Sequence, residues 1–184
     1  MVSQGITILE STGAKLKKYT IDREERMVVE NAIAEFEGQG CKSIEMFGTT
    51  PSIKALLGII SAHFGAEFKG VFVNYCPDGH HDISDRSDSE VVISVGATRT
   101  MHFKRTTSPP IGTAHFRGGS FKVAMVDGSM FALQGAKFPF AYTHGIPKET
   151  TVSEPHWFFT FRRHLDSVRT AETESDTAKR VKLE

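Results

Sequence analysis

Between residues 22 and 37, apolar residues recur three or four positions apart, which predicts a helix with one apolar face. Asp22 and Glu25 open this segment at the spacing of a capping box. The apolar face consists of Met27, Val28, Ala32, Ile33 and Phe36. A second amphipathic helix is predicted from Pro51, which suits a first-turn position, to Gly65, which suits a helix end.

After residue 65 the apolar positions alternate with polar ones, which is the period of a strand. Gly, Pro, Asp or Ser clusters separate the short runs. One strand is predicted before the second helix, at 43–47. The others are predicted at 68–75, 91–95, 100–104, 113–116, 120–125, 130–133, 140–143 and 157–161. Helices first and strands later predict an α+β chain, with the helices packed on one face of a sandwich, barrel or jelly roll.

Length and composition predict one folded domain over residues 1–164, with a helical part at about 20–65 and a β core at about 66–163. Apolar residues make up 39% and charged residues 24% of the 184 positions, enough for a packed core. Residues 165–184 hold no aromatic side chain and few apolar ones, which indicates a polar, disordered tail.

Charge and cysteine content narrow the function classes. The 22 Lys and Arg residues balance 22 Asp and Glu residues, which argues against a strongly cationic nucleic-acid coat but leaves room for a local basic groove. Two cysteines suit a reducing compartment, and no run approaches the roughly 18 apolar residues of a membrane helix. We therefore expect an intracellular, cytoplasmic or nuclear protein without membrane contact. Lys179–Lys182 is either a basic import signal or an ordinary solvated charge cluster.

Several segments of the β region carry chemistry-bearing residues in a definite order. They are Asn74–Gly79, Arg86–Glu90, Val91–Phe103, Asp127–Met130, Tyr142–Pro147 and His156–Arg162. Over residues 43–163 this order resembles the AlkB family of iron(II)- and 2-oxoglutarate-dependent dioxygenases. The resemblance implies a double-stranded β-helix (jelly roll), Fe(II) and 2-oxoglutarate as cofactors, and an alkylated DNA or RNA base as substrate.

The family binds iron through a His-x-Asp pair and a distant His, a set that leaves three metal positions open. By resemblance, Asp88 and His144 are metal ligands, but Arg86 stands where the family has its first His. An arginine has no lone pair to give a metal and would instead form an ion pair with Asp88. A rearranged loop offers His80 or His81 as the third ligand.

The resemblance also implies a 2-oxoglutarate site made of Asn74, Tyr75, Arg162 and His156. Arg162 matches the last arginine of the family motif, whereas His156 stands where the family has the arginine that grips the far carboxylate. Tyr75 and Cys76 occupy the two positions where the family has any residue followed by tyrosine.

Four further residues match substrate-facing positions of the family: Glu90, Arg99, Met46 and Phe47. Glu90 is equally a solvated turn carboxylate, and Arg99 is equally a structural partner of Asp88 or Glu90. Met46 and Phe47 either belong to a substrate lid or form an ordinary strand-to-helix turn.

Two main hypotheses follow. One is an active oxygenase that dealkylates nucleic-acid bases. The other is a catalytically silent AlkB-like module, without iron chemistry and with no cofactor, that binds nucleic acid or a protein partner. A different ligand or metal in the same pocket is a third, because one fold supports many functions.

Overall fold

The structure is a computed structural model of the 184-residue chain. It describes residues 8–9, 15–37, 43–46, 50–86, 91–105, 120–134 and 142–163.

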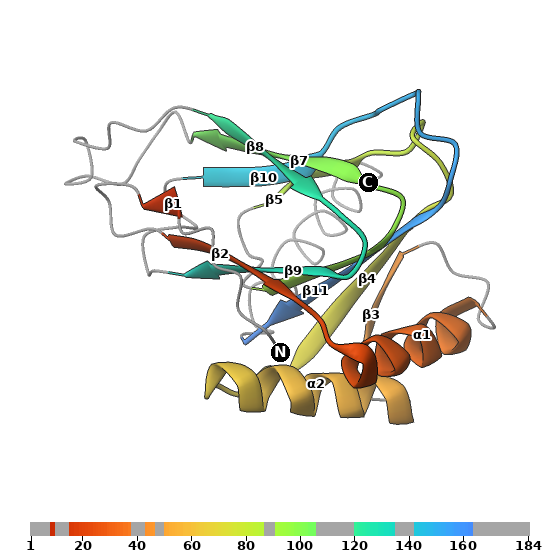
Figure 1. Ribbon diagram of the computed structural model, residues 1–184, viewed down its shortest axis with the longest axis vertical. Helices are drawn as coiled ribbons and strands as arrows, with labels where there is room; N and C mark the ends of the chain where they lie inside the picture. The colour runs from red at the N-terminus through yellow and green to blue at the C-terminus, as the bar shows by residue number, and fades with distance from the viewer. Residues whose placement is uncertain are drawn as a thin grey trace, which may run out of the picture.

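Two antiparallel sheets face each other, and two helices cover the far side of the larger one (Figure 1). The larger sheet has the order β1-β2-β9-β6-β11-β4-β3 and the smaller β5-β10-β7-β8. The elements are β1 Ile8–Leu9, β2 Lys15–Thr20, α1 Arg23–Glu37, β3 Ser43–Met46, α2 Pro51–Phe64, β4 Gly70–Cys76, β5 Ile83–Arg86, β6 Val91–Gly96, β7 Arg99–Arg105, β8 Phe121–Met125, β9 Ser129–Gln134, β10 Tyr142–Ile146 and β11 His156–Arg162.

Both helices begin and end where the sequence predicts. At the start of α1, the Asp22 carboxylate accepts from the Glu25 N–H (2.9 Å) and the Glu25 carboxylate accepts from the Asp22 N–H (2.8 Å), which confirms the capping box. Helix α2 has Thr50 as its N-cap, Pro51 in its first turn and Gly65 in the left-handed region at its end (φ 58°).

One detail of the predicted helix face is wrong. Met27 is 58% exposed, while Val29, one residue outside the predicted stripe, is fully buried. The stripe that packs on the sheet therefore runs through Val29, Ala32 and Phe36.

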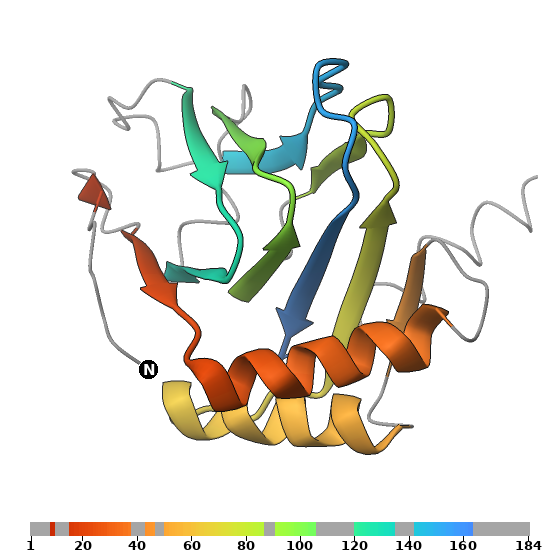
Figure 2. The same cartoon turned by 45° about the vertical axis from the view of Figure 1, so that its right-hand side comes forward.

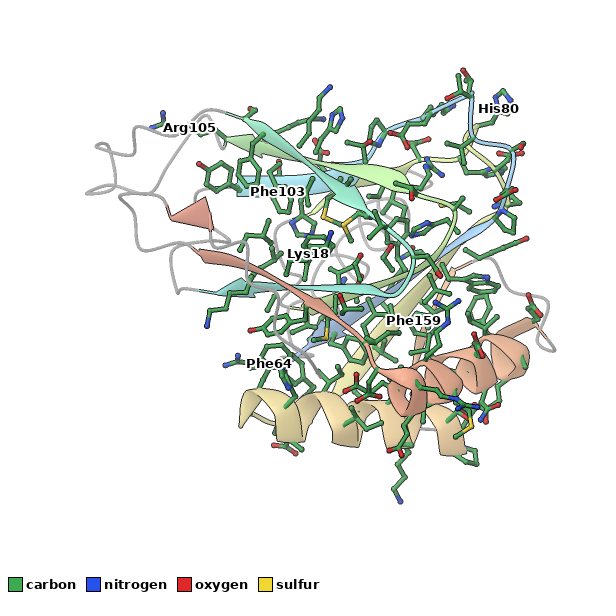
Figure 3. All side chains as sticks on the ribbon, in the orientation of Figure 1. Lys18, Phe64, His80, Phe103, Arg105 and Phe159 are labelled. Carbon is green, nitrogen blue, oxygen red and sulfur yellow. The ribbon has the colours of Figure 1, made fainter. Side chains whose placement is uncertain are left out.

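Alternation along the strands of the larger sheet divides its side chains between two cores. One core lies between this sheet and the helices and contains Phe159, and the other lies between the two sheets and contains Phe103 (Figure 3). The turned view shows both helices on the same side, with the smaller sheet away from them (Figure 2). The predicted α+β arrangement, with helices on one sheet, is confirmed.

Strand prediction succeeds where apolar residues alternate and fails in two polar segments. Residues 15–20 form β2 and residues 83–86 form β5, although neither has an alternating apolar pattern. Strand β2 is paired at both edges, with Leu16 buried between the sheets and Tyr19 buried toward the helices. These are opposite faces, as strand alternation requires, but the lysines between them leave no apolar pattern to read from the sequence. The predicted strand at 113–116 and the polar tail at 165–184, with Lys179–Lys182, lie outside the described residues.

Candidate functional site

The face of the larger sheet that looks toward the smaller one carries polar side chains at buried positions. Strands β4 and β11 pair so that Asn74 lies opposite Phe158 and Cys76 lies opposite His156. Cross-strand partners share a face, and so do alternate residues of one strand. The buried polar residues of these strands, with those of β6 and β9, are Asn74, Ser94, Ser129, His156, Thr160 and Arg162.

His144 reaches the same interior from the smaller sheet. It lies in β10 and is 5% exposed, with its ring 5.6 Å from the Phe103 ring. It lines a small hollow between the sheets together with Asn74 and Thr160. The structure thus brings together two of the residues that the AlkB resemblance singled out, Asn74 and His144.

Position 86 is the direct register partner of His144 across β5 and β10. Backbone pairing therefore puts an arginine beside His144, at the position where the resemblance implies a metal-binding His. Asp88 and Glu90 lie outside the described residues, so their predicted roles as metal ligand and substrate contact stay predictions.

His156 is wholly buried, and both of its ring nitrogens are engaged. Nδ1 donates to the Ala97 carbonyl, because a carbonyl can only accept, and Nε2 lies 3.1 Å from the Ser94 hydroxyl. Burial lowers the pKa of His156 to about 4, a shift that the contact with Ala97 opposes and nearby Arg99 reinforces. At neutral pH this residue is uncharged, so it does not replace the family's arginine as a grip for a carboxylate.

Tyr75 does not share the interior with Asn74. It packs on the helix side of the larger sheet, where its ring lies 4.3 Å from the Trp157 ring. Tyr75 and Asn74 are separated because neighbouring residues of a strand point to opposite faces, and the role of Tyr75 in a 2-oxoglutarate site stays a prediction. Cys76, two residues after Asn74, takes the inner position, and burial raises the pKa of its thiol.

Arg162 is also buried between the sheets, 4% exposed, with its guanidinium carbon 5.5 Å from the centre of the Phe72 ring. It shares the inner face with His156 because the two are six residues apart on one strand. Its predicted role in binding 2-oxoglutarate stays a prediction.

Arg99 is fully buried, and its guanidinium joins two loops, the one between β4 and β5 and the one between β10 and β11. Nε donates to the Glu149 carboxylate (3.1 Å), one terminal nitrogen donates to the Asp78 carbonyl (3.1 Å), and the other donates to the carbonyls of His81 (2.8 Å) and Pro147 (2.9 Å). Burial alone would raise the pKa of Glu149, but its bonds from Thr100 and Arg99 outweigh this and hold it below its usual value. With these donors engaged and no exposed surface, Arg99 does not fit a substrate contact.

His80 and His81 belong to the turn before β5, at the outer corner of the molecule, where Figure 3 labels His80. The Asp78 carboxylate accepts from the His80 N–H (2.9 Å) and lies 2.8 Å from Nδ1 of His81. Both are exposed. Among the described residues, no three His, Cys, Asp or Glu side chains gather as metal ligands, so this placement gives the proposed third ligand no support.

Two proposed substrate contacts remain untested. Met46 is described only as the last residue of β3, where its backbone pairs with Val71, and Phe47 lies outside the described residues.

Sequence reasoning did not single out Ser94, Cys76 or Glu149. Ser94 had a signal, because it is a polar residue inside the apolar run Val91–Val95. Cys76 had one too, since it follows Asn74 at the strand period. Glu149 had none, because its partner Arg99 lies 50 residues away.

Among the residues that the structure describes, the interior offers little that fits an iron ion with 2-oxoglutarate. The hollow at His144 has a volume of about 20 Å³, which is room for about one water, whereas a five-carbon keto-dicarboxylate needs several times that space. The backbone register partner of His144 is an arginine, and the position where the family has its carboxylate-gripping arginine holds the neutral His156.

The chain is similar to one solved structure that places its fold. The crystal structure of a prolyl-4-hydroxylase from Pseudomonas putida matches 84% of this chain and 94% of its own, with 10% identity and a TM-score of 0.51. At this identity the likeness shows the fold alone, and this chain has a dioxygenase-like fold. No family model matches the sequence, and neither does any curated protein. Neither α1 nor α2 is long and apolar enough to cross a membrane.

Proposed function

We propose that this chain is a dioxygenase-fold domain that binds nucleic acid without iron chemistry, the silent-module hypothesis of the sequence analysis. The two sheets would form the jelly roll that the AlkB resemblance implies, over residues 1–164. The interior would serve as a packed support for a binding surface rather than as a reaction chamber.

The single observation that carries the proposal is the pairing of position 86 with His144. A facial metal site needs donors with lone pairs at adjacent positions, and arginine stays protonated at any physiological pH. The neutral, hydrogen-bonded His156 and the small hollow support the same conclusion for 2-oxoglutarate.

Nucleic acid is the partner proposed because the ordered segments from Asn74 to Arg162 resemble the AlkB family, whose substrates are alkylated bases. The balanced total charge means that such binding would use a local basic surface rather than the whole molecule. Binding to a protein partner is the alternative outcome of the binding experiment below.

A metal titration tests the loss of iron chemistry. We expect the wild-type chain to take up no Mn²⁺ or Co²⁺ at micromolar concentration by calorimetry and to form no succinate from 2-oxoglutarate with Fe(II). Arg86→His should gain measurable Co²⁺ affinity, because it completes a His, Asp, His set with Asp88 and His144. Arg86→Gln is the matched control, since it removes the charge without adding an imidazole. Metal uptake by the wild-type chain that His144→Ala abolishes, together with succinate formation, would show an active oxygenase instead.

Fluorescence anisotropy with labelled single-stranded DNA and RNA tests the binding claim. We expect the Asp88→Ala, His144→Ala double variant to bind as the wild-type chain does, because neither residue contacts nucleic acid in this proposal. Absence of binding to any oligonucleotide would overturn the choice of partner and leave a protein partner as the remaining hypothesis.

A further inference from the structure

A second, larger hollow is lined by residues on the outer face of the smaller sheet, among them His102 and Lys104. The smaller sheet lies away from the helices (Figure 2). The volume of the hollow is about 470 Å³, within the range of pockets that hold small molecules.

Gly145 contributes no side chain to the hollow, and the half-buried Ile83 and Pro147 add apolar surface. Ile146 also borders it, but the Ile146 side chain is buried in the core between the sheets. The hollow borders the small interior space at His144, and Ile83, Ser84, Gly145 and Ile146 line both.

Three basic side chains lie in a row beside this apolar surface. His102 and Lys104 are alternate residues of β7 and share its outer face, and Lys122 of β8 is the direct register partner of His102. His102 is half-buried, whereas both lysines are exposed. Across the other neighbouring strand, the register partner of His102 is Gly145, and the Asp85 carboxylate lies where a side chain at position 145 would be.

Two carboxylates also line the hollow, and each has a lysine near it. The Lys104 ammonium lies 2.7 Å from the Asp85 carboxylate, and the Lys148 ammonium lies 4.0 Å from the Asp82 carboxylate. These side chains are between 37% and 64% exposed, and exposed pairs of this kind contribute about 0–1 kcal/mol. Lys104 can therefore exchange Asp85 for another anion at small cost.

We propose that this hollow binds one unit of a single-stranded nucleic acid, with a backbone phosphate on the row His102, Lys104 and Lys122. The proposal rests on the proposed function and names the surface that would perform it. The apolar surface of Ile83 and Pro147 would receive the sugar or an unstacked base, which single strands expose and duplexes hide.

The surroundings of His102 agree with a site for an anion. Burial lowers the pKa of His102, and Lys122 and Lys104 lower it further, while Glu149 and Asp85 act in the opposite direction. A phosphate placed on the row would offset the two lysines and favour the protonated ring, which then donates a hydrogen bond to the phosphate.

Charge variants test the site in both directions. Lys104→Gln with Lys122→Gln should weaken binding of a labelled single-stranded oligonucleotide at least about tenfold and reduce the slope of log affinity against log salt by about 2. Asp85→Asn should tighten binding, because it frees Lys104. Lys54→Gln with Lys69→Gln is the matched control, since these exposed lysines lie on α2 and just before β4 and removing them makes the same change in net charge.

The same variants with inorganic phosphate separate this inference from the proposed function. The NMR signals of the His102 ring should shift with phosphate in the wild-type chain and not in the Lys104→Gln, Lys122→Gln variant. If oligonucleotides bind and both double variants behave alike, the surface is wrong and the proposed function stands. If phosphate shifts His102 but no oligonucleotide binds, the anion site stands and nucleic acid is the wrong partner. If neither probe binds, both proposals fail.

Discussion

Consecutive residues of β11 enter two different environments. Trp157, Phe159 and Phe161 pack against the helices, where the Trp157 ring meets Phe36 edge-on at 5.1 Å. His156 and Phe158 face the smaller sheet, where their rings lie 3.9 Å apart. The helix side of this strand is an ordinary apolar core, whereas its inner side buries polar groups that must find partners.

The helix side of β11 contributes to stability, whereas its inner side holds the polar groups that could take part in chemistry. Rings against the helices need only shape and apolar area, so that side of the strand is explained by packing alone. On the inner side, the Ser94 hydroxyl and the Ala97 carbonyl are the hydrogen-bond partners of the His156 ring. Because both ring nitrogens are occupied in this way, His156 stabilises the fold and has no ring nitrogen left for a ligand. A dioxygenase-like fold can therefore remain intact while the groups that would serve a cofactor are committed elsewhere.

The largest change in the free energy of unfolding should follow a substitution on the helix side of β11. Phe159→Ala should lower the free energy of unfolding by about 3–5 kcal/mol, because it leaves a cavity at a fully buried position. Urea denaturation measures the change, and the binding of oligonucleotide by the folded variant should be unaltered. A loss below about 1 kcal/mol would mean that this core is loosely packed.

His156, on the inner side of β11, should make the free energy of unfolding depend on pH. His156 has a pKa of about 4 when folded and about 6.5 when unfolded, so the unfolded chain binds more protons between these values. Stability is then complete above pH 6.5 and falls by roughly 3 kcal/mol as the pH drops to 4. Unfolding of wild-type and His156→Gln chains over this range isolates the contribution; equal slopes would show that His156 is protonated in the fold.

Ser94→Ala should have a smaller effect, about 1–2 kcal/mol, because it leaves Nε2 of His156 buried without its hydroxyl partner. A double-mutant cycle with His156→Gln measures the coupling between the two residues. Additive losses would mean that the 3.1 Å contact contributes nothing to stability.

Tyr75→Phe should have the smallest effect on the free energy of unfolding. Its ring packs against Trp157 on the helix side, so removal of the hydroxyl should alter unfolding by less than about 0.5 kcal/mol and leave oligonucleotide binding unchanged. A clear loss of binding would return Tyr75 to the functional site and contradict the division of the two faces.

The sequence alone determined the local elements of this protein. The capping box at Asp22, the Pro51 start of α2 and the short aromatic run of β11 are properties of neighbouring residues, so local composition and turn chemistry predict them. The side to which Tyr75 points also follows from its odd spacing to Asn74, although the family pattern suggested otherwise.

Tertiary structure alone decided which distant residues meet. His144 is paired with position 86 and Arg99 with Glu149 because strand register and loop packing bring together segments 50 or more residues apart. Local preferences carry no information about such pairs, since side chains there are selected by the neighbours that the completed sheets supply. The same holds for the outer hollow, which exists only because β5, β7 and β10 lie side by side around Gly145.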